Sequence, residues 1–135
     1  MPVIIRNIFE DYVKERFDLE DCIAVNNGSS AIIAPLWSMD LKADDEVITT
    51  AFTFISTVTS IIVAGAKPVF VDINENDHLI NADLIEAAIT PKTKAIMPVH
   101  LFGQVCDMKK INQIAKKYNL VVIEDTSQSF GAEQN

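Results

Sequence analysis

The stretch VVIEDTSQSFG, residues 121–131, joins a short run of branched apolar residues to two carboxylates and a polar turn. Residues 121–123 have the pattern of a strand that is buried on both faces of a parallel sheet. Glu124 and Asp125 follow at its carboxyl end, where open α/β sheets bind their ligands. A carboxylate buried there needs a cation, a metal or hydrogen-bond donors to offset its desolvation. Spacing alone leaves two interpretations open: a ligand role, or Asp125 capping the next turn while Glu124 points to solvent.

A second stretch, VNNGSSAI at residues 25–32, ends an earlier predicted strand in the same way and favours the ligand role. Residues 22–25 predict that strand, Gly28 permits a tight bend, and Ser29 or Ser30 can cap the helix that begins there. Backbone N–H groups at a helix start, aided by the helix dipole, form an anion site, typically for phosphate. Taken alone, one glycine with two serines is weak evidence for an anion site, and an ordinary helix N-cap is the simpler interpretation.

The chain alternates between extended and helical patterns. We expect strands at 22–25, 46–50, 68–73, 94–100 and 121–123, and helices at 5–17, 55–64, 81–89 and 108–118. A further helix runs from the turn at Gly28 to about Leu41, and its Pro35 should break one backbone hydrogen bond and kink the axis. The alternation predicts an α/β fold, a parallel sheet with right-handed crossovers and helices on both faces.

Two other side chains lie near predicted strand ends. Two interpretations of Phe54 are open: a core residue, or a ring that stacks on a flat ligand. His100 is explained as a ligand-binding residue or as a hydrogen-bonded structural one.

Composition narrows the class of protein. The 135 residues suffice for one domain, and 49% hydrophobic with 22% charged residues is typical of a globular protein. The net charge of −8 argues against binding to nucleic acid or to an anionic membrane surface. The sequence shows neither a membrane-spanning run nor a signal peptide. Cys22 and Cys106 lack metal-ligand spacing and indicate reduced thiols, so we expect a cytoplasmic protein without a metal site.

Five segments together resemble a known family. They are NNGSSAI, DDEVITTAFTFIST, GAKPVFVDI, EAAITPKTKAIMPVHLFGQ and VVIEDTSQSFGA. Their order and spacing are similar to those of the DegT/DnrJ/StrS family, pyridoxal-phosphate (PLP) sugar aminotransferases of the aspartate-aminotransferase fold type (fold type I). The resemblance covers about residues 22–131 and implies a nucleotide-sugar substrate, an amino-acid donor and a homo-oligomer.

The resemblance also implies a role for each matching residue. Gly28 and Ser29 match the pair that holds the cofactor phosphate, and Phe54 matches the aromatic that stacks on the pyridine ring. Asp125 matches the aspartate that pairs with the pyridinium nitrogen, which keeps the ring protonated as an electron sink. Gln128 matches the neighbouring residue that contacts the ring. Thr126 and Ser127 stand where the family favours alanine.

The Schiff-base lysine of the family lies beyond the segment that matches this chain, and none of the lysines present corresponds to it. We therefore expect residues 1–135 to be an incomplete large domain, without the small C-terminal domain and inactive alone. Two alternatives stay open: a non-catalytic α/β fragment that binds a cofactor or partner, and a fragment of a lysine-free sugar dehydratase relative.

The resemblance finally implies a strand order. The segments 68–73, 46–50, 94–99 and 121–124 should lie side by side in that order as a parallel sheet. The strand at 22–25 would lack its usual neighbour, so we expect it to pair with the exposed edge of 121–124 or with another chain, which would distort the PLP site.

Overall fold

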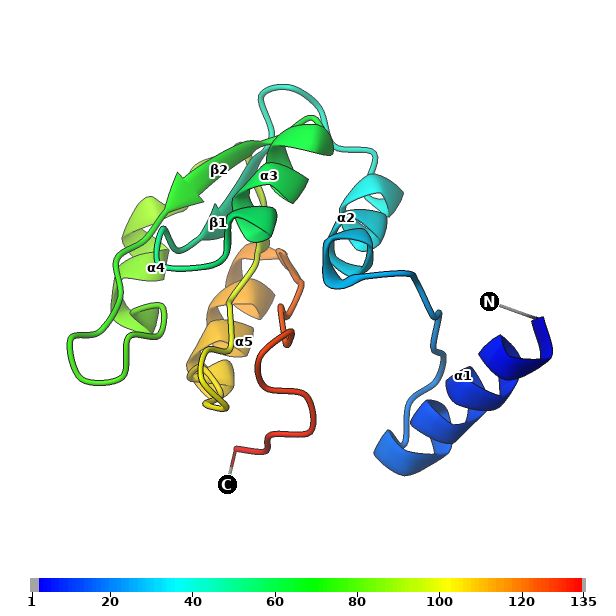
Figure 1. The fold of residues 1–135 in the computed structure, drawn as a ribbon. Helices are drawn as coiled ribbons and strands as arrows, with labels where there is room; N and C mark the ends of the chain where they lie inside the picture. Colours follow the sequence, from blue (N-terminus) through cyan, green and yellow to red (C-terminus); the bar gives the residue numbers. More distant parts are fainter. Residues whose placement is uncertain (1–2, 135) are drawn as a thin grey trace.

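The computed structural model describes residues 3–134 and contains one parallel four-stranded sheet (Figure 1). Its strands are β1 (Glu46–Thr49), β2 (Lys67–Phe70), β3 (Thr93–Ile96) and β4 (Val121–Val122). They lie in the order β2-β1-β3-β4, with every neighbouring pair parallel. This confirms the strand order that the resemblance implies for these four segments.

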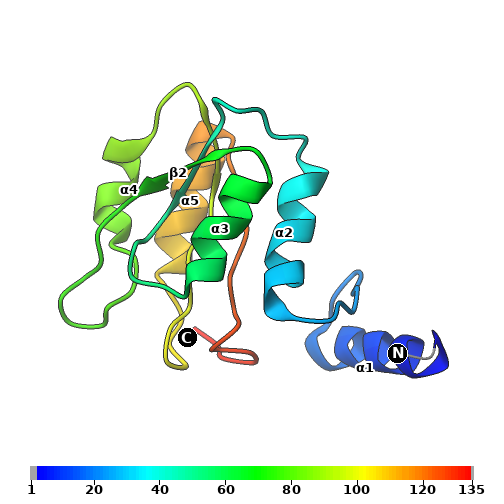
Figure 2. The same cartoon turned by 45° about the horizontal axis from the view of Figure 1, so that its top comes forward.

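Helices cover both faces of the sheet, as predicted. On one face lie α2 (Gly28–Ser38) and α3 (Ile55–Val63), and on the other α4 (Ala82–Ala88) and α5 (Met108–Tyr118); α1 (Val3–Phe17) does not contribute to either core. Figure 2 shows α2 and α3 side by side, with α4 and α5 behind the strands and α1 apart from the rest.

Two apolar clusters hold these layers together because successive strand residues point to opposite faces. Val47 of β1 packs with α2 and α3, in a cluster that includes Leu36 and Ile61. Its neighbour Ile48 packs on the other face with α4 and α5, in a cluster that includes Ile111. Each helix pair is therefore fixed to the sheet by its own core.

The predicted strand at residues 22–25 does not form within the chain, and its predicted pairing with the edge of β4 is wrong, whereas pairing with another chain stays a prediction. The structure shows irregular chain there, and neither the edge of β4 nor any other strand of residues 3–134 pairs with it. The N–H of Ala24 in this segment instead donates to Oε1 of Glu10 in α1 at 2.8 Å. A strand needs a partner for its backbone groups, and β4, only two residues long, offers little to pair with.

Several predicted boundaries are also corrected. α2 ends at Ser38 instead of Leu41, runs through Pro35 without interruption, and is capped by Asn27 instead of Ser29 or Ser30. The strands are shorter than predicted, because only their first residues pair. Val121, predicted to be buried, is 47% exposed because β4 is the edge strand.

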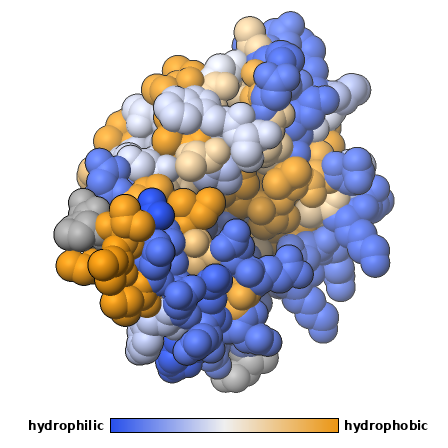
Figure 3. Space-filling model, turned by 90° about the vertical axis from the view of Figure 1, so that its right-hand side faces the viewer, coloured by the Kyte–Doolittle hydropathy of each residue, from blue (hydrophilic) through white to orange (hydrophobic). Residues whose placement is uncertain are grey.

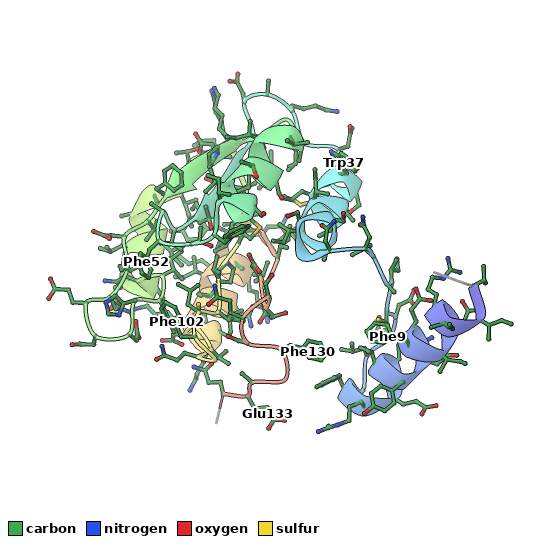
Figure 4. All side chains as sticks on the ribbon, viewed as in Figure 1. Phe9, Trp37, Phe52, Phe102, Phe130 and Glu133 are labelled. Carbon is green, nitrogen blue, oxygen red and sulfur yellow. The ribbon has the colours of Figure 1, made fainter. Side chains whose placement is uncertain are left out.

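Helix α1 exposes most of its apolar residues. Val13 is its only buried residue, whereas Ile4, Ile8 and Tyr12 are all more than 60% exposed. Hydrophobic residues accordingly gather on the side of the molecule drawn in Figure 3. The chain end reaches α1 through Phe130, whose ring meets that of Phe17 edge-on at 4.9 Å (Figure 4). Within residues 3–134, no helix combines the length and the apolar character needed to cross a membrane.

Candidate functional site

Asp125 lies just past β4, and the main chain fixes its position. Its N–H donates to the carbonyl of Pro98 at 3.0 Å, and its carbonyl accepts from the N–H of His100 at 3.0 Å. These bonds continue the parallel pairing of β3 and β4 as an isolated bridge between Val99 and Asp125. The carboxylate therefore stands at the carboxyl end of the sheet, as the sequence predicts, and its residue is only 5% exposed.

Hydroxyl groups surround this carboxylate. Oδ2 of Asp125 accepts from Oγ1 of Thr57 at 2.9 Å. Oδ1 accepts from Oγ of Ser127 at 2.6 Å and from the N–H of Ser127 at 3.2 Å. The capping interpretation is thus correct for one oxygen, while the residue also lines a cavity. These hydrogen-bond donors offset part of the cost of burying the carboxylate.

The N-termini of α2 and α3 meet beside the same cavity. The side chain of Asn27 accepts from the N–H of Ser30 at 2.8 Å, so the N–H groups of Gly28 and Ser29 remain without an intrahelical partner. The hydroxyl of Ser29 lies 2.7 Å from that of Ser56, in the first turn of α3. Two helix dipoles therefore direct partial positive charge to one place, which suits an anion.

Gly28 lies close to the turn that carries Asp125. A Cβ atom added at Gly28 would come within 3.4 Å of Oγ of Ser127. The start of α2 and the turn that carries Asp125 thus lie next to each other at Gly28, and both line one cavity.

The cavity has a volume of about 300 Å³. It is lined by Gly28, Ser29, Ile32, Thr53, Phe54, Ser56, Thr57, Val99, Asp125, Ser127 and Gln128. All five residues that the resemblance proposes for the cofactor site are in this lining. Phe54 ends the loop before α3 and is 69% exposed, so it is a wall of the cavity and not a core residue. The side-chain oxygen of Gln128 accepts from the N–H of Phe102 at 3.3 Å, which orients its amide.

Sequence reasoning missed the hydroxyls that contact Asp125. Thr57 is fully buried, and its partner carboxylate is 68 residues away in sequence. Its side chain also lies 2.8 Å from the hydroxyl of Thr53. A threonine pair four residues apart at a helix start is the only sequence signal, and it is common in helices without a ligand site.

His100 has a structural role. It is 2% exposed, and its Nδ1 accepts from the N–H of Cys106 at 3.2 Å. Nε2 must therefore carry the proton, which it donates to Oε2 of Glu124 at 2.9 Å. Glu124, whose side chain is 47% exposed, is therefore partly open to solvent and also hydrogen-bonded to His100. Burial raises the pKa of the Cys106 thiol to about 11, which keeps it protonated.

The described residues show neither a metal centre nor a lysine at the cavity. Within residues 3–134, no group of three or more His, Cys, Asp or Glu side chains could hold a metal ion. No lysine of this part of the chain lines the cavity.

Known proteins resemble this chain in both sequence and architecture. The chain is 51% identical, over 96% of its length, to the pleiotropic regulatory protein of Geobacillus stearothermophilus, of which it covers 37%. It is 42% identical, over 94% of its length, to dTDP-3-amino-3,4,6-trideoxy-alpha-D-glucose transaminase of Micromonospora megalomicea, of which it covers 34%. The structure of NtdA from Bacillus subtilis with bound cofactor PMP matches with a TM-score of 0.90 and 42% identity, over 93% of this chain and 29% of that one. The chain spans about a third of the length of the curated relatives that it matches. Residues 6–135 match the DegT/DnrJ/EryC1/StrS aminotransferase family, and the chain therefore belongs to that family.

Proposed function

We propose that this chain forms the PLP-binding part of an aminotransferase that acts on nucleotide-linked keto-sugars. One observation supports the proposal above the others. Gly28, Ser29, Phe54, Asp125 and Gln128, which come from three separate segments, line a single cavity.

The chemistry of the cavity fits PLP. A volume of about 300 Å³ is at the lower end of the range for small-molecule sites. Its paired helix N-termini suit a phosphate, its buried carboxylate suits a protonated ring nitrogen, and its exposed aromatic wall suits a flat ring. A phosphorylated pyridine combines these three features in one molecule.

Each group of residues then has a distinct task. The N–H groups of Gly28 and Ser29, with the hydroxyls of Ser29 and Ser56, would bind the phosphate. Phe54 would cover one face of the ring and exclude water from it. Asp125 would hold a proton at the ring nitrogen. When bound, PLP supplies an electron sink for charge that develops at the substrate carbon.

The substrate class rests on relatives, among them the dTDP-sugar transaminase of Micromonospora megalomicea. An amino-acid donor and a keto-sugar nucleotide are the substrates that we propose. Because no lysine of residues 3–134 lines the cavity, we expect the isolated chain to bind the cofactor without turnover.

Binding of pyridoxamine phosphate (PMP) tests the proposal. PMP has no aldehyde and so does not react with surface lysines. We expect it to bind at least tenfold more tightly than pyridoxamine, which lacks the phosphate. Asp125→Asn should weaken PMP binding by about 10- to 100-fold, since a hydrogen bond to a charged group contributes about 1.5–3 kcal/mol.

Asp40→Asn is the matched control, because it removes the same charge from a side chain that is 89% exposed and lies outside the cavity lining. Equal affinity for PMP and pyridoxamine, or unchanged PMP affinity in Asp125→Asn, would refute the proposed site.

The homo-oligomer stays a prediction. The exposed apolar residues of α1 are compatible with burial against a second copy. Sedimentation velocity across a range of protein concentrations would detect it, and a monomer throughout that range would contradict it.

A further inference from the structure

A chain of hydroxyl groups ends on the carboxylate of Asp125. We propose that Thr57 and Ser127, with Thr53 behind Thr57, are positioning residues that hold this carboxylate in the direction needed to meet the ring nitrogen of PLP. The inference rests on the proposed function and extends it to three hydroxyls that have no role in that proposal.

The direction of each hydrogen bond follows from proton counting. An ionised carboxylate only accepts, and a threonine hydroxyl has a single proton to donate. Thr57 gives its proton to Oδ2 of Asp125, 2.9 Å away. In the 2.8 Å contact between Thr53 and Thr57, Thr53 must then be the donor. The result is a directed chain from Thr53 to Thr57 to Asp125, in which each bond polarises the next.

The two oxygens of Asp125 are held from different elements. Thr57 belongs to α3 and binds Oδ2, whereas Ser127 belongs to the turn after β4 and binds Oδ1. Rotation of the carboxylate about its Cβ–Cγ bond would break both contacts. The plane of the carboxylate is therefore held jointly by α3 and by the turn after β4.

The remaining capacity of the carboxylate matches one ligand donor. An ionised carboxylate offers about four lone-pair sites. The hydroxyls of Thr57 and Ser127 and the N–H of Ser127 fill three of them. Because Asp125 lines the cavity, the open site is available to a donor there, such as a protonated ring nitrogen.

The hydroxyl of Thr57 is buried, so no other donor can take its place beside Asp125. Thr57 is 0% exposed, so water cannot replace its hydroxyl when it is removed. Ser127 is more exposed, but its Oγ lies against Gly28, where an added Cβ would come within 3.4 Å. The group that orients Asp125 is thus also packed against the start of α2.

The test compares PMP with its 1-deaza analogue, in which a C–H group replaces the ring nitrogen. The ratio of the two dissociation constants isolates the contact between Asp125 and the nitrogen. We expect wild type to prefer PMP by more than tenfold. Thr57→Val, which keeps the shape but removes the hydroxyl, should lower this ratio about tenfold, and Thr57→Ser should restore it.

Thr59→Val is the matched control on the same helix. Thr59 is exposed, and its hydroxyl donates to the main-chain carbonyl of Ile55 at 3.1 Å, so the ratio should stay at the wild-type value. In the Asp125→Asn background, Thr57→Val should leave the ratio unchanged, because its effect acts through the carboxylate. A purely structural role would not give this dependence on Asp125.

Ser127→Ala provides a second variant outside the core, and it should lower the ratio several-fold even if Thr57→Val does not fold. Wild-type ratios in both variants would overturn the positioning role while leaving the proposed function intact. Failure of the wild type to distinguish the two ligands would instead refute the proposed contact of Asp125 with the ring nitrogen, and the positioning role with it.

Discussion

Two adjacent isoleucines of α3 should differ sharply in their effect on stability. Ile61 is 0% exposed, and Ile62 is 56% exposed. Ile61 belongs to the cluster with Leu36 and Val47, which joins α3 to α2 and the sheet. Replacing a fully buried isoleucine by alanine costs about 2–5 kcal/mol, from lost burial and from the cavity left behind. We expect about 3 kcal/mol for Ile61→Ala and less than about 1 kcal/mol for Ile62→Ala.

The pair is well matched because both substitutions remove the same atoms from the same helix. Each also replaces a β-branched residue by alanine, so the gain in helix propensity is shared and cancels in the difference. Urea unfolding followed by circular dichroism measures both free energies. With a slope of about 1–3 kcal/mol per molar urea, the midpoint of Ile61→Ala should fall by about 1–3 M, with the slope unchanged.

Equal midpoint shifts in the two variants would refute this assignment. Such a result would mean that α3 does not bury Ile61 against α2 and the sheet. The direction of Thr57 towards Asp125 would then lose its basis as well, since both side chains are placed by the same helix.

Three further outcomes are expected. A thiol reagent should label Cys22 quickly but Cys106 only in denaturant. The pKa of about 11 leaves Cys106 with about one thiolate in a thousand at pH 8. Two fast thiols in a colorimetric titration would contradict this. Asn119 ends α5 in the left-handed conformation, with φ of 54°, which glycine adopts easily and alanine does not. In thermal melts, Asn119→Ala should therefore destabilise the chain by about 1 kcal/mol and Asn119→Gly by much less. PLP followed by borohydride should label lysines slowly and at many sites, and a single stoichiometric adduct in a peptide map would contradict the absence of a lysine from the cavity.

The sheet could be predicted largely because its signals are local. Each of the four paired strands contains apolar residues and is followed by polar ones, and α5 matches its predicted limits of 108–118. The predicted ends were too long because the chain stays extended after pairing stops. Residues 97–100 illustrate this, since they contain Pro98 and join β4 only through the isolated bridge of Val99 with Asp125.

The strand predicted at residues 22–25 failed for a different reason. Its apolar residues fit a buried strand, but a strand exists only if a neighbour satisfies its backbone groups. Nothing in a single segment reports whether that neighbour is present. Ile23 is 80% exposed as a result.

The candidate site divides in the same way. Gly28, Phe54 and Asp125 could be proposed for the site because each lies in a segment that resembles the family. The role proposed for Thr57 was not foreseen because it depends on a contact with a residue 68 positions away. Pairing of this kind arises from the packing of α3 on the sheet and leaves no pattern in the local sequence.

The position of the apolar core explains how the site can keep unpaired donors. Ile32 and Leu36 of α2 pack with Ile61 of α3, so the two helices are aligned by side chains one to several turns away from their N-termini. The hydroxyl contact between Ser29 and Ser56 joins the starts themselves. The N–H groups of the first turn of α2 are therefore not needed to hold the helices together. They stay oriented yet free for a ligand, which is the arrangement that lets an anion bind without first reorganising the protein.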